Sequence, residues 1–283
     1  MITSLTINKL INSEQEEIWN GRLGEGFLKV EKFIDATVEP FSKIAIEKVN
    51  AKEGDKILDI GCGHGSTSIS LAKSGAKVIG IDISEKMISR AKEKSSNIPN
   101  ISFYTSDAAV KNFEKEYNHV FSRFGVMFFS DPYSAFSNIF SGITNKGKIT
   151  FLCWQDISEN DWINCTNEVL KPFQPEQLTP IDPRSPGGFS FSDKEYVFDI
   201  LKGSGFSNIE INPLNTKFDM GKSIDEIMSF HLSIGPLSGL MENLDDDTSK
   251  EVIRLVRVLL EGKMEENGLH LDAAAWLVTA ESK

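Results

Sequence analysis

At 283 residues the chain can bury a hydrophobic core as one large domain or as two ordinary ones. Apolar residues make up 40% and charged residues 25%, and the formal net charge of −11 makes nucleic acid an unexpected partner. No apolar run reaches the roughly 20 residues that span a membrane. The N-terminus also lacks a signal-peptide pattern, so we expect a cytoplasmic protein without membrane insertion.

Helices are expected first along the chain, and a strand and helix alternation follows. Residues 13–50 carry apolar side chains at helical spacing, and Pro40 interrupts them, so we expect two helices or a kinked pair. Between residues 51 and 155, short apolar strands alternate with helices, which is typical of a parallel sheet covered on both faces. The expected strands are 56–60, 77–81, 101–105, 118–122 and 148–154. The expected helices between them are 66–73, 84–95 and 131–142.

The pattern changes after Trp154. The elements expected there are a helix at 159–171, a proline-rich loop at 172–186, a helix at 193–202, a strand at "SNIEINPLN" (207–215), helices at 223–240 and 246–264, and a last strand at "LHLDAAAWLVTAE" (269–281). The two helices within 223–264 therefore interrupt the sheet before its last strand.

The stretch "LDIGCGHGSTSIS" (58–70) is typical of a turn that cradles a nucleotide-like ligand between a strand and a helix. The dinucleotide fingerprint is G-x-G-x-x-G, whereas Gly61, Gly63 and Gly65 alternate here and Asp59 precedes them. A carboxylate would repel a pyrophosphate but attract an ammonium group. S-adenosylmethionine (SAM) carries an α-amino group, a carboxylate and no phosphate. Asp59 therefore favours SAM over NAD as the ligand.

Two further acids follow the next two strands. Asp82 ends the second strand, where a carboxylate can accept hydrogen bonds from both ribose hydroxyls. Asp107 follows the third strand, where the adenine amino group is expected, and Ala108 offers a backbone N–H to the ring. Open α/β sheets bind ligands at the carboxyl ends of their strands, so the three acids predict one site.

Residues 56–155 resemble the class I SAM-dependent methyltransferases, most of all the small-molecule branch with the ubiquinone/menaquinone-type (methyltransferase type 11-like) enzymes. "ILDIGCGHG" matches the first motif, "VIGIDIS" the ribose strand, "SDAA" the adenine turn, "HVFSRFGVMFF" the fourth-strand motif and "NKGKITFLCW" the turn into the fifth strand. The resemblance implies a doubly wound α/β fold with a mostly parallel, seven-stranded Rossmann-like sheet. It also implies N-terminal helices and a helical insertion before the last strand.

Together the motifs and the resemblance predict one methyltransferase domain over residues 1–283 that uses SAM. Its expected parts are a helical lid at 13–50, a SAM-binding core at 51–155, a loop-rich substrate side at 156–222, a helical cap at 223–265 and a final strand at 266–283. The residues expected to contact the cofactor are Trp19, Arg22, Asp59, Gly61, Cys62, Gly63, Asp82, Ile83, Asp107, Ala108, Ser122 and Arg123.

The fourth strand indicates a small acceptor. Enzymes that methylate planar amines typically carry Asn/Asp-Pro-Pro-aromatic there, whereas this chain has Ser122-Arg123-Phe124-Gly125. We expect an apolar or aromatic molecule over residues 123–129, covered by Trp19, Arg22 and the segment 222–245, with methyl transfer achieved largely by proximity and orientation. If the acceptor must lose a proton, His231 and Arg123 are weak catalytic candidates.

Other side chains are expected to be structural. His64 is read as filling the glycine loop, and His119 and His270 as structural residues of their strands. Three scattered cysteines predict reduced thiols, with no disulfide framework and no metal site. Two alternative functions stay open, namely a SAM-binding regulatory protein without catalysis and an NAD-dependent oxidoreductase. The acceptor, the acceptor atom and the oligomeric state are not readable from the sequence.

Overall fold

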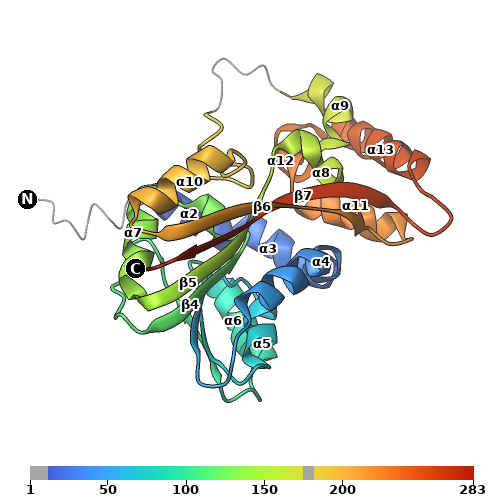
Figure 1. Ribbon diagram of the computed structural model, residues 1–283. Helices are drawn as coiled ribbons and strands as arrows, with labels where there is room; N and C mark the ends of the chain where they lie inside the picture. Colours follow the sequence, from blue (N-terminus) through green and yellow to red (C-terminus); the bar gives the residue numbers. More distant parts are fainter. Residues whose placement is uncertain (1–11, 175–181) are drawn as a thin grey trace, which may run out of the picture.

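The computed structural model describes residues 12–174 and 182–283, which form a seven-stranded sheet with helices around it (Figure 1). The strand order is β3-β2-β1-β4-β5-β7-β6. β7 runs antiparallel to both β5 and β6, and the other described pairs are parallel. The strands are β1 (Lys56–Ile60), β2 (Lys77–Asp82), β3 (Ile101–Thr105), β4 (Tyr117–Arg123), β5 (Ile143–Trp154), β6 (Ser207–Asp219) and β7 (His270–Glu281). The prediction of a doubly wound, mostly parallel sheet is confirmed.

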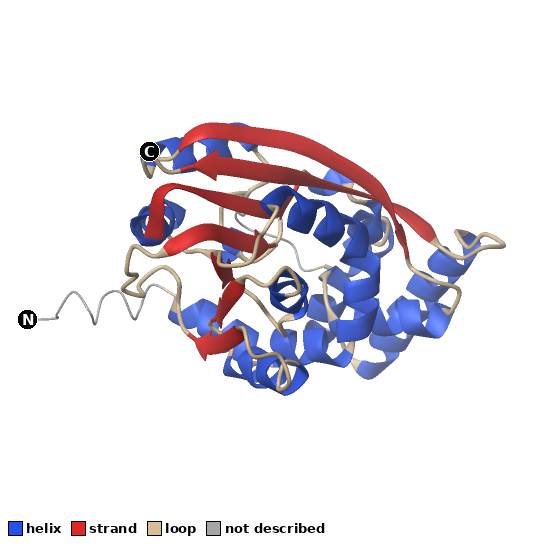
Figure 2. Cartoon of the chain, turned by 60° about the horizontal axis from the view of Figure 1, so that its bottom comes forward, coloured by secondary structure: helices blue, strands red, loops and turns tan. Residues whose placement is uncertain are grey.

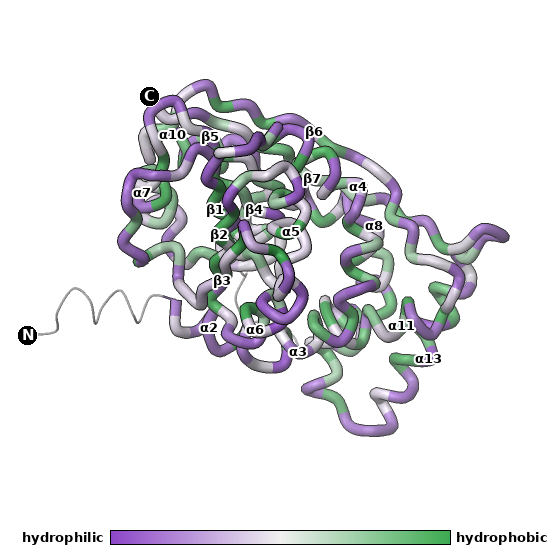
Figure 3. The backbone as a smooth tube through the Cα atoms, turned by 90° about the horizontal axis from the view of Figure 1, so that it is seen from below, coloured by the Kyte–Doolittle hydropathy of each residue, from purple (hydrophilic) through white to green (hydrophobic). Residues whose placement is uncertain are grey.

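The helices of the alternating region begin where the sequence predicts them. The Ser84 hydroxyl accepts the Met87 N–H at the start of α6, and the Asp131 carboxylate accepts the Ser134 N–H at the start of α7. Helices α4, α5 and α6 cover one face of the sheet, and α7 and α10 cover the other (Figure 1). The central strands between them are the most hydrophobic part of the chain (Figure 3). The flanking helices are α5 (Ser66–Ala72), α6 (Glu85–Lys94), α7 (Pro132–Gly142) and α10 (Lys194–Gly203).

The N-terminal segment forms three helices, α2 (Ser13–Asn20), α3 (Arg22–Lys29) and α4 (Glu31–Val49). Of the two alternatives predicted at Pro40, a break between two helices is wrong, because Pro40 lies inside α4 and the helix continues past it. A kink at Pro40 stays a prediction. A proline removes one N–H bond from a helix, but the α4 residues that follow it are anchored in the core, where Phe41 and Ala45 are fully buried. Tertiary packing therefore outweighs the local signal.

The segments after β5 and between β6 and β7 together build a helical cap, defined here as residues 157–173 and 224–262. The predicted helix at 159–171 is divided, as is the one at 223–240, where Gly235 adopts φ 83° before Pro236. Helices α8 and α9 pack with α11, α12 and α13 near one end of the long β6–β7 pair, which arches over them (Figures 1 and 2). The cap helices are α8 (Asp161–Asn164), α9 (Asn167–Leu170), α11 (Ile224–Ser233), α12 (Pro236–Leu240) and α13 (Asp246–Gly262).

Two strands are longer than predicted. β5 begins at Ile143 and β6 continues to Asp219, because both pair along their length with β7 or β4. The predicted loop at 172–186 lies partly outside the described residues. None of the helices in residues 12–174 and 182–283 combines the length and apolar character needed to cross a bilayer.

Candidate functional site

The glycine loop between β1 and α5 is held against the end of β4. Gly61, Gly63 and Gly65 have φ of 62°, 53° and 84°, a region that other residues rarely adopt. A Cβ atom on Gly61 would lie 2.8 Å from the Cα atom of Gly125, so the two backbones are in close contact. A Cβ atom on Gly63 would meet no atom within 4 Å, which leaves open space in front of the loop.

Asp59 lies fully buried at the end of β1, directly before this loop. Its Oδ2 atom accepts hydrogen bonds from Thr67 Oγ1 at 3.0 Å and from Ser68 Oγ at 2.5 Å. Its Oδ1 atom has no hydrogen-bond partner among the residues that the structure describes. Burial raises the pKa of Asp59 to about 6. A buried oxygen without a partner is costly, and a donor on a bound ligand would satisfy it.

Asp82, the last residue of β2, is hydrogen-bonded to the glycine loop. Its Oδ2 atom accepts the Gly63 N–H at 2.8 Å and its Oδ1 atom accepts the Ser84 N–H at 2.9 Å. Burial raises its pKa as well. A carboxylate offers about four acceptor sites, so Asp82 can hold the loop and still accept from a ligand hydroxyl.

Cys62 adds a further link between the loop and β2, because its N–H donates to the Ile81 carbonyl at 3.1 Å. Burial raises the pKa of its thiol well above the usual range.

Asp107 follows β3 at the same edge of the sheet. Its Oδ1 atom accepts the Ala109 N–H at 2.8 Å, and its Oδ2 atom accepts from Asn12 Nδ2 at 2.7 Å. Asn12 precedes α2 and also accepts the Ser130 N–H through Oδ1 at 3.3 Å. Asn12, just before α2, therefore links the segment after β3 to the segment after β4. Ala108, the neighbour of Asp107, is buried.

Helix α2 lies across the predicted cofactor site. The Trp19 carbonyl accepts from Ser84 Oγ at 2.9 Å, and Asn20 Oδ1 accepts the Glu85 N–H at 2.9 Å, both directly after Asp82 and Ile83. The Trp19 ring meets the Phe128 ring edge-on at 5.1 Å between centroids. Trp19 thus connects the residues that follow β2 and β4, and the role of the N-terminal helices as a lid stays a prediction.

Arg22, the first residue of α3, contacts the helical cap. Its guanidinium donates to the Ser238 carbonyl at 2.7 Å and to Ser238 Oγ at 2.8 Å, and it pairs with Glu242. These contacts tie the N-terminal helices to α12. A contact between Arg22 and the cofactor therefore stays a prediction.

The end of β4 combines a polar and an aromatic side. Ser122 Oγ donates to the Ile60 carbonyl at 2.7 Å and joins β4 to β1. Arg123 Nη1 donates to Ser42 Oγ at 3.1 Å, and its Nη2 atom lies 3.3 Å from Asp35 Oδ1. The next residue, Phe124, adopts φ 59°, an uncommon conformation for a bulky residue.

Phe124 forms part of an aromatic cluster. Its ring stacks on Trp154 at 3.9 Å between centroids with an interplanar angle of 6°. Trp154 in turn contacts Phe41 on α4, Trp162 of the cap and Phe218 on β6. The aromatic cluster therefore connects β4 and β5 with the lid side and the cap.

Asp35 is a site residue that the sequence reasoning missed. It contacts both Arg123 and His64, whose Nε2 atom lies 2.9 Å from Asp35 Oδ2. His64 is buried within the glycine loop, which is compatible with the predicted loop-filling role, and it also bonds Asp35. Because Asp35 is distant from both partners in sequence, no local pattern indicates the contact.

The remaining histidines are placed as follows. His119 bonds Thr150 Oγ1 at 2.9 Å within the sheet, and His270 lies near Asp219 on the neighbouring strand. His231 is buried in α11, and burial lowers its pKa to about 4, so it is neutral at pH 7. Within the described part of the chain its Nε2 atom has no partner. Its role as a base stays a prediction.

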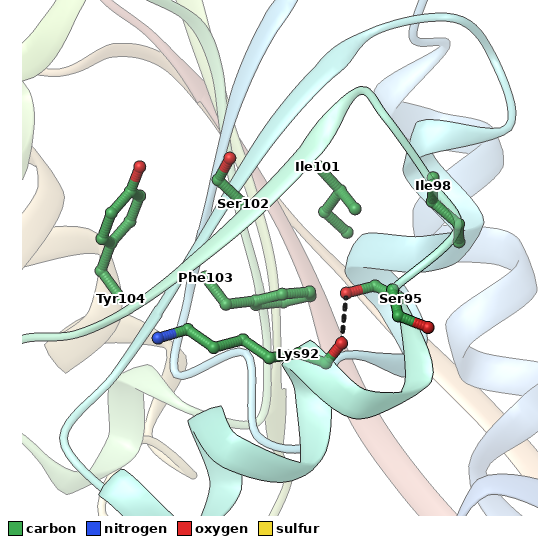
Figure 4. A pocket seen from close by; sticks show the side chains of 8 residues that line it. Lys92, Ser95, Ile98, Ile101, Ser102, Phe103 and Tyr104 are labelled. Carbon is green, nitrogen blue, oxygen red and sulfur yellow. Dashed lines mark hydrogen bonds between the residues drawn. The ribbon is translucent and has the colours of Figure 1, made fainter.

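Two surface hollows lie away from these residues. One, of about 380 Å³, lies beside the edge strand β3 and the end of α6 and is lined by residues that include Phe103 and Lys92 (Figure 4). The other, of about 400 Å³, lies between α3, α4 and α11. Neither borders a predicted site residue. Across residues 12–174 and 182–283, no three His, Cys, Asp or Glu side chains gather as metal ligands.

Comparisons with known proteins agree with the fold and the loop. Residues 57–147 match the family described as "Methyltransferase domain". Phosphoethanolamine N-methyltransferase 1 of Zea mays is 29% identical over 59% of this chain, and the chain spans 31% of that protein's length. Demethylmenaquinone methyltransferase of Staphylococcus saprophyticus is 24% identical, over 72% of this chain and 83% of that protein. The crystal structure of the YcgJ protein from Bacillus subtilis superposes with a TM-score of 0.57 at 14% identity, over 86% of this chain and 97% of that chain.

Proposed function

Because the chain is a class I SAM-dependent methyltransferase, we propose that it methylates a small, apolar or aromatic molecule. The relatives' names cover acceptors as different as demethylmenaquinone and phosphoethanolamine. The acceptor class of this chain therefore depends on its own residues.

The geometry of the glycine loop fits SAM. The unpartnered Oδ1 atom of Asp59 can accept the α-ammonium group, and the open space at Gly63 leaves room for it. The Asp82 carboxylate can accept the ribose hydroxyls, and Asp107 with Ala108 would lie at the adenine. SAM supplies a methyl group already activated by its sulfonium. The protein therefore needs above all to bind, to orient and to exclude water.

The observation that carries the acceptor proposal is Phe124. It follows β4 directly, it is only partly buried, and it keeps a strained φ of 59° while stacked on Trp154. Strain of this kind persists only where the surroundings impose it, and it often marks ligand sites. Phe128, also partly buried, presents a second ring beside Trp19. An aromatic wall of this kind suits an apolar or planar acceptor better than a phosphate.

In this proposal the lid and the cap hold the acceptor in line with the activated methyl group. The contact between Arg22 and Ser238 links the two parts. No base is required unless the acceptor must lose a proton. In that case His231 is the candidate, because its imidazole is neutral at pH 7 and its Nε2 atom has no partner among the described residues, although its lowered pKa makes it a weak base. Arg123, held by Asp35 and Ser42, is better suited to bind an anionic group than to act as a base.

We further propose that the acceptor is not a nucleic acid, because the net charge of −11 disfavours binding to a phosphate backbone, and that the protein is cytoplasmic. Nothing in the described site favours the NAD-dependent oxidoreductase or the regulatory protein without catalysis. Both alternatives are tested by the same experiment.

The purified chain is incubated with methyl-labelled SAM and an extract of the source cells, and the organic-soluble fraction is analysed by mass spectrometry. We expect label in a low-mass compound that is heavier by one CH₂ group than its precursor. The Asp59→Asn variant serves as the control and should give much less label at a SAM concentration near the wild-type Kd. Label found only in macromolecules would overturn the acceptor class. SAM binding without any labelled product would support the regulatory protein, and thermal protection by NAD but not by SAM would support the oxidoreductase.

A further inference from the structure

Asp35 on α4 joins four elements around the glycine loop. Its Oδ2 atom lies 2.9 Å from His64 Nε2 in the loop and accepts from Ser66 Oγ, at the start of α5, at 2.5 Å. Its Oδ1 atom lies 3.3 Å from Arg123 Nη2 at the end of β4. Lys94 Nζ, in the last turn of α6, lies 3.7 Å from Oδ2 and also donates to Ser66 Oγ at 3.0 Å.

This cluster is largely withdrawn from solvent. The side chains of Asp35, Arg123 and His64 are 27%, 14% and 6% exposed. Although burial opposes ionisation, the His64 hydrogen bond and the Arg123 charge hold the pKa of Asp35 well below its usual range. An ionised carboxylate only accepts, so His64 must donate from Nε2, and Asp35 thereby fixes the orientation of its ring.

Arg123 keeps unused donors beside the loop. Asp35 pairs with Arg123 and lies 3.7 Å from Lys94, and the buried Glu31 is a second carboxylate close to Lys94 and His64. The guanidinium of Arg123 has five N–H donors, and Asp35 and Ser42 use two of them. Arg123 is also close enough to Asp59 to favour the ionised form of that carboxyl. The cluster and Asp59 thus present a cation and an anion on neighbouring elements, which matches the amino-acid end of SAM.

We propose that Asp35 is a positioning residue for the amino-acid end of SAM, acting by holding His64 and Arg123 against the glycine loop. Arg123 is then oriented for the carboxylate of SAM while Asp59 takes its ammonium group. This inference rests on the proposed function, and it assigns to α4 a part in cofactor recognition besides its place in the lid.

The test compares two ligands that differ only at that end. S-adenosylhomocysteine carries the amino acid, and 5′-methylthioadenosine lacks it. In Asp35→Asn the size is kept and the charge is lost, so we expect calorimetric affinity for S-adenosylhomocysteine to fall about tenfold or more, as for a lost charged hydrogen bond. Affinity for 5′-methylthioadenosine should change less than about twofold. Glu39→Gln, an exposed acid one turn further along α4, is the matched control and should change neither.

A second variant keeps the charge. Asp35→Glu displaces the carboxylate by one methylene, so its loss of S-adenosylhomocysteine affinity should be smaller than that of Asp35→Asn. Equal weakening of both ligands, or no weakening of either, would show that Asp35 is only part of the scaffold and would overturn the inference alone. Failure of the wild-type chain to bind S-adenosylhomocysteine would overturn the proposed function and this inference with it.

Discussion

Replacing Asp59 by asparagine is expected to separate cofactor binding from stability. Burial raises the pKa of Asp59 from an ordinary 3.8 to about 6. Keeping it ionised at pH 8 therefore costs roughly 3 kcal/mol of folding free energy, at about 1.4 kcal/mol for each tenfold change in proton affinity. Because the folded pKa is the higher one, this cost is absent below pH 4 and grows as the pH rises through 6.

The variant removes this cost and adds a smaller one. The amide oxygen of Asp59→Asn can still accept from Thr67 and Ser68. The amide nitrogen of the new side chain takes the place of the unpartnered Oδ1 atom. As a buried donor without a partner, it lowers the stability of the protein by about 1–3 kcal/mol. The net change at pH 8 is then about 0 to 2 kcal/mol of stabilisation, and the melting temperature should equal or exceed that of the wild type.

The same substitution should also weaken the binding of SAM. Loss of a charged hydrogen bond costs about 1.5–3 kcal/mol, so the Kd should rise roughly 10- to 150-fold. At a SAM concentration about 100 times the wild-type Kd, the ligand adds roughly 2.7 kcal/mol to the wild type, or about 5–10 °C. After a hundredfold loss of affinity the same concentration adds only about 0.4 kcal/mol, or roughly 1 °C.

The assay is differential scanning fluorimetry at pH 8 with and without SAM, checked by titration calorimetry. The exposed Asp199 on α10, changed to asparagine, is the control and should behave like the wild type. A folded Asp59→Asn variant that keeps the full SAM-induced shift would show that the ammonium group lies elsewhere. A melting temperature well below that of the wild type at pH 8 would refute the argument from burial.

Three further outcomes are expected. The wild-type affinity for SAM should fall about tenfold for each pH unit below 6, as Asp59 takes up a proton, whereas calorimetry should show no such dependence in Asp59→Asn. Gly61→Ala should destabilise the protein by about 2–4 kcal/mol in a thermal melt, because its methyl group would meet the backbone of Gly125 after β4. Gly63→Ala, which has only the positive φ, should cost about 1–2 kcal/mol, and equal costs would contradict the packing. Phe124→Leu should raise the acceptor KM about two- to tenfold through the lost stacking without changing SAM affinity. Phe140→Leu, in a partly buried ring pair on α7, is the control and should change neither, and an unchanged KM in Phe124→Leu would place the acceptor elsewhere.

The alternating core of the fold could be predicted because its signals are local. β1 and β3 begin and end where the apolar runs do, and the caps at Ser84 and Asp131 start their helices as expected. The positions of Asp59 and Asp82 followed from topology alone, since parallel strands bring their carboxyl ends to one edge. The preference for SAM over NAD came from the charge of Asp59 beside three glycines, and the family motifs in residues 56–155 supported it.

Tertiary structure decided what depends on distant partners. Pro40 stays inside a helix because the core holds that helix on the sheet, and no local pattern contains this information. The contact between Asp35 and His64 spans 29 residues of sequence, and the one between Arg22 and Ser238 spans 216. Sequence periodicity reports which face of an element is apolar, but not which other element covers it. The sequence by itself therefore determined the cofactor loop and its acids, whereas only the folding of α4 and the cap onto that loop decided what surrounds the ligand.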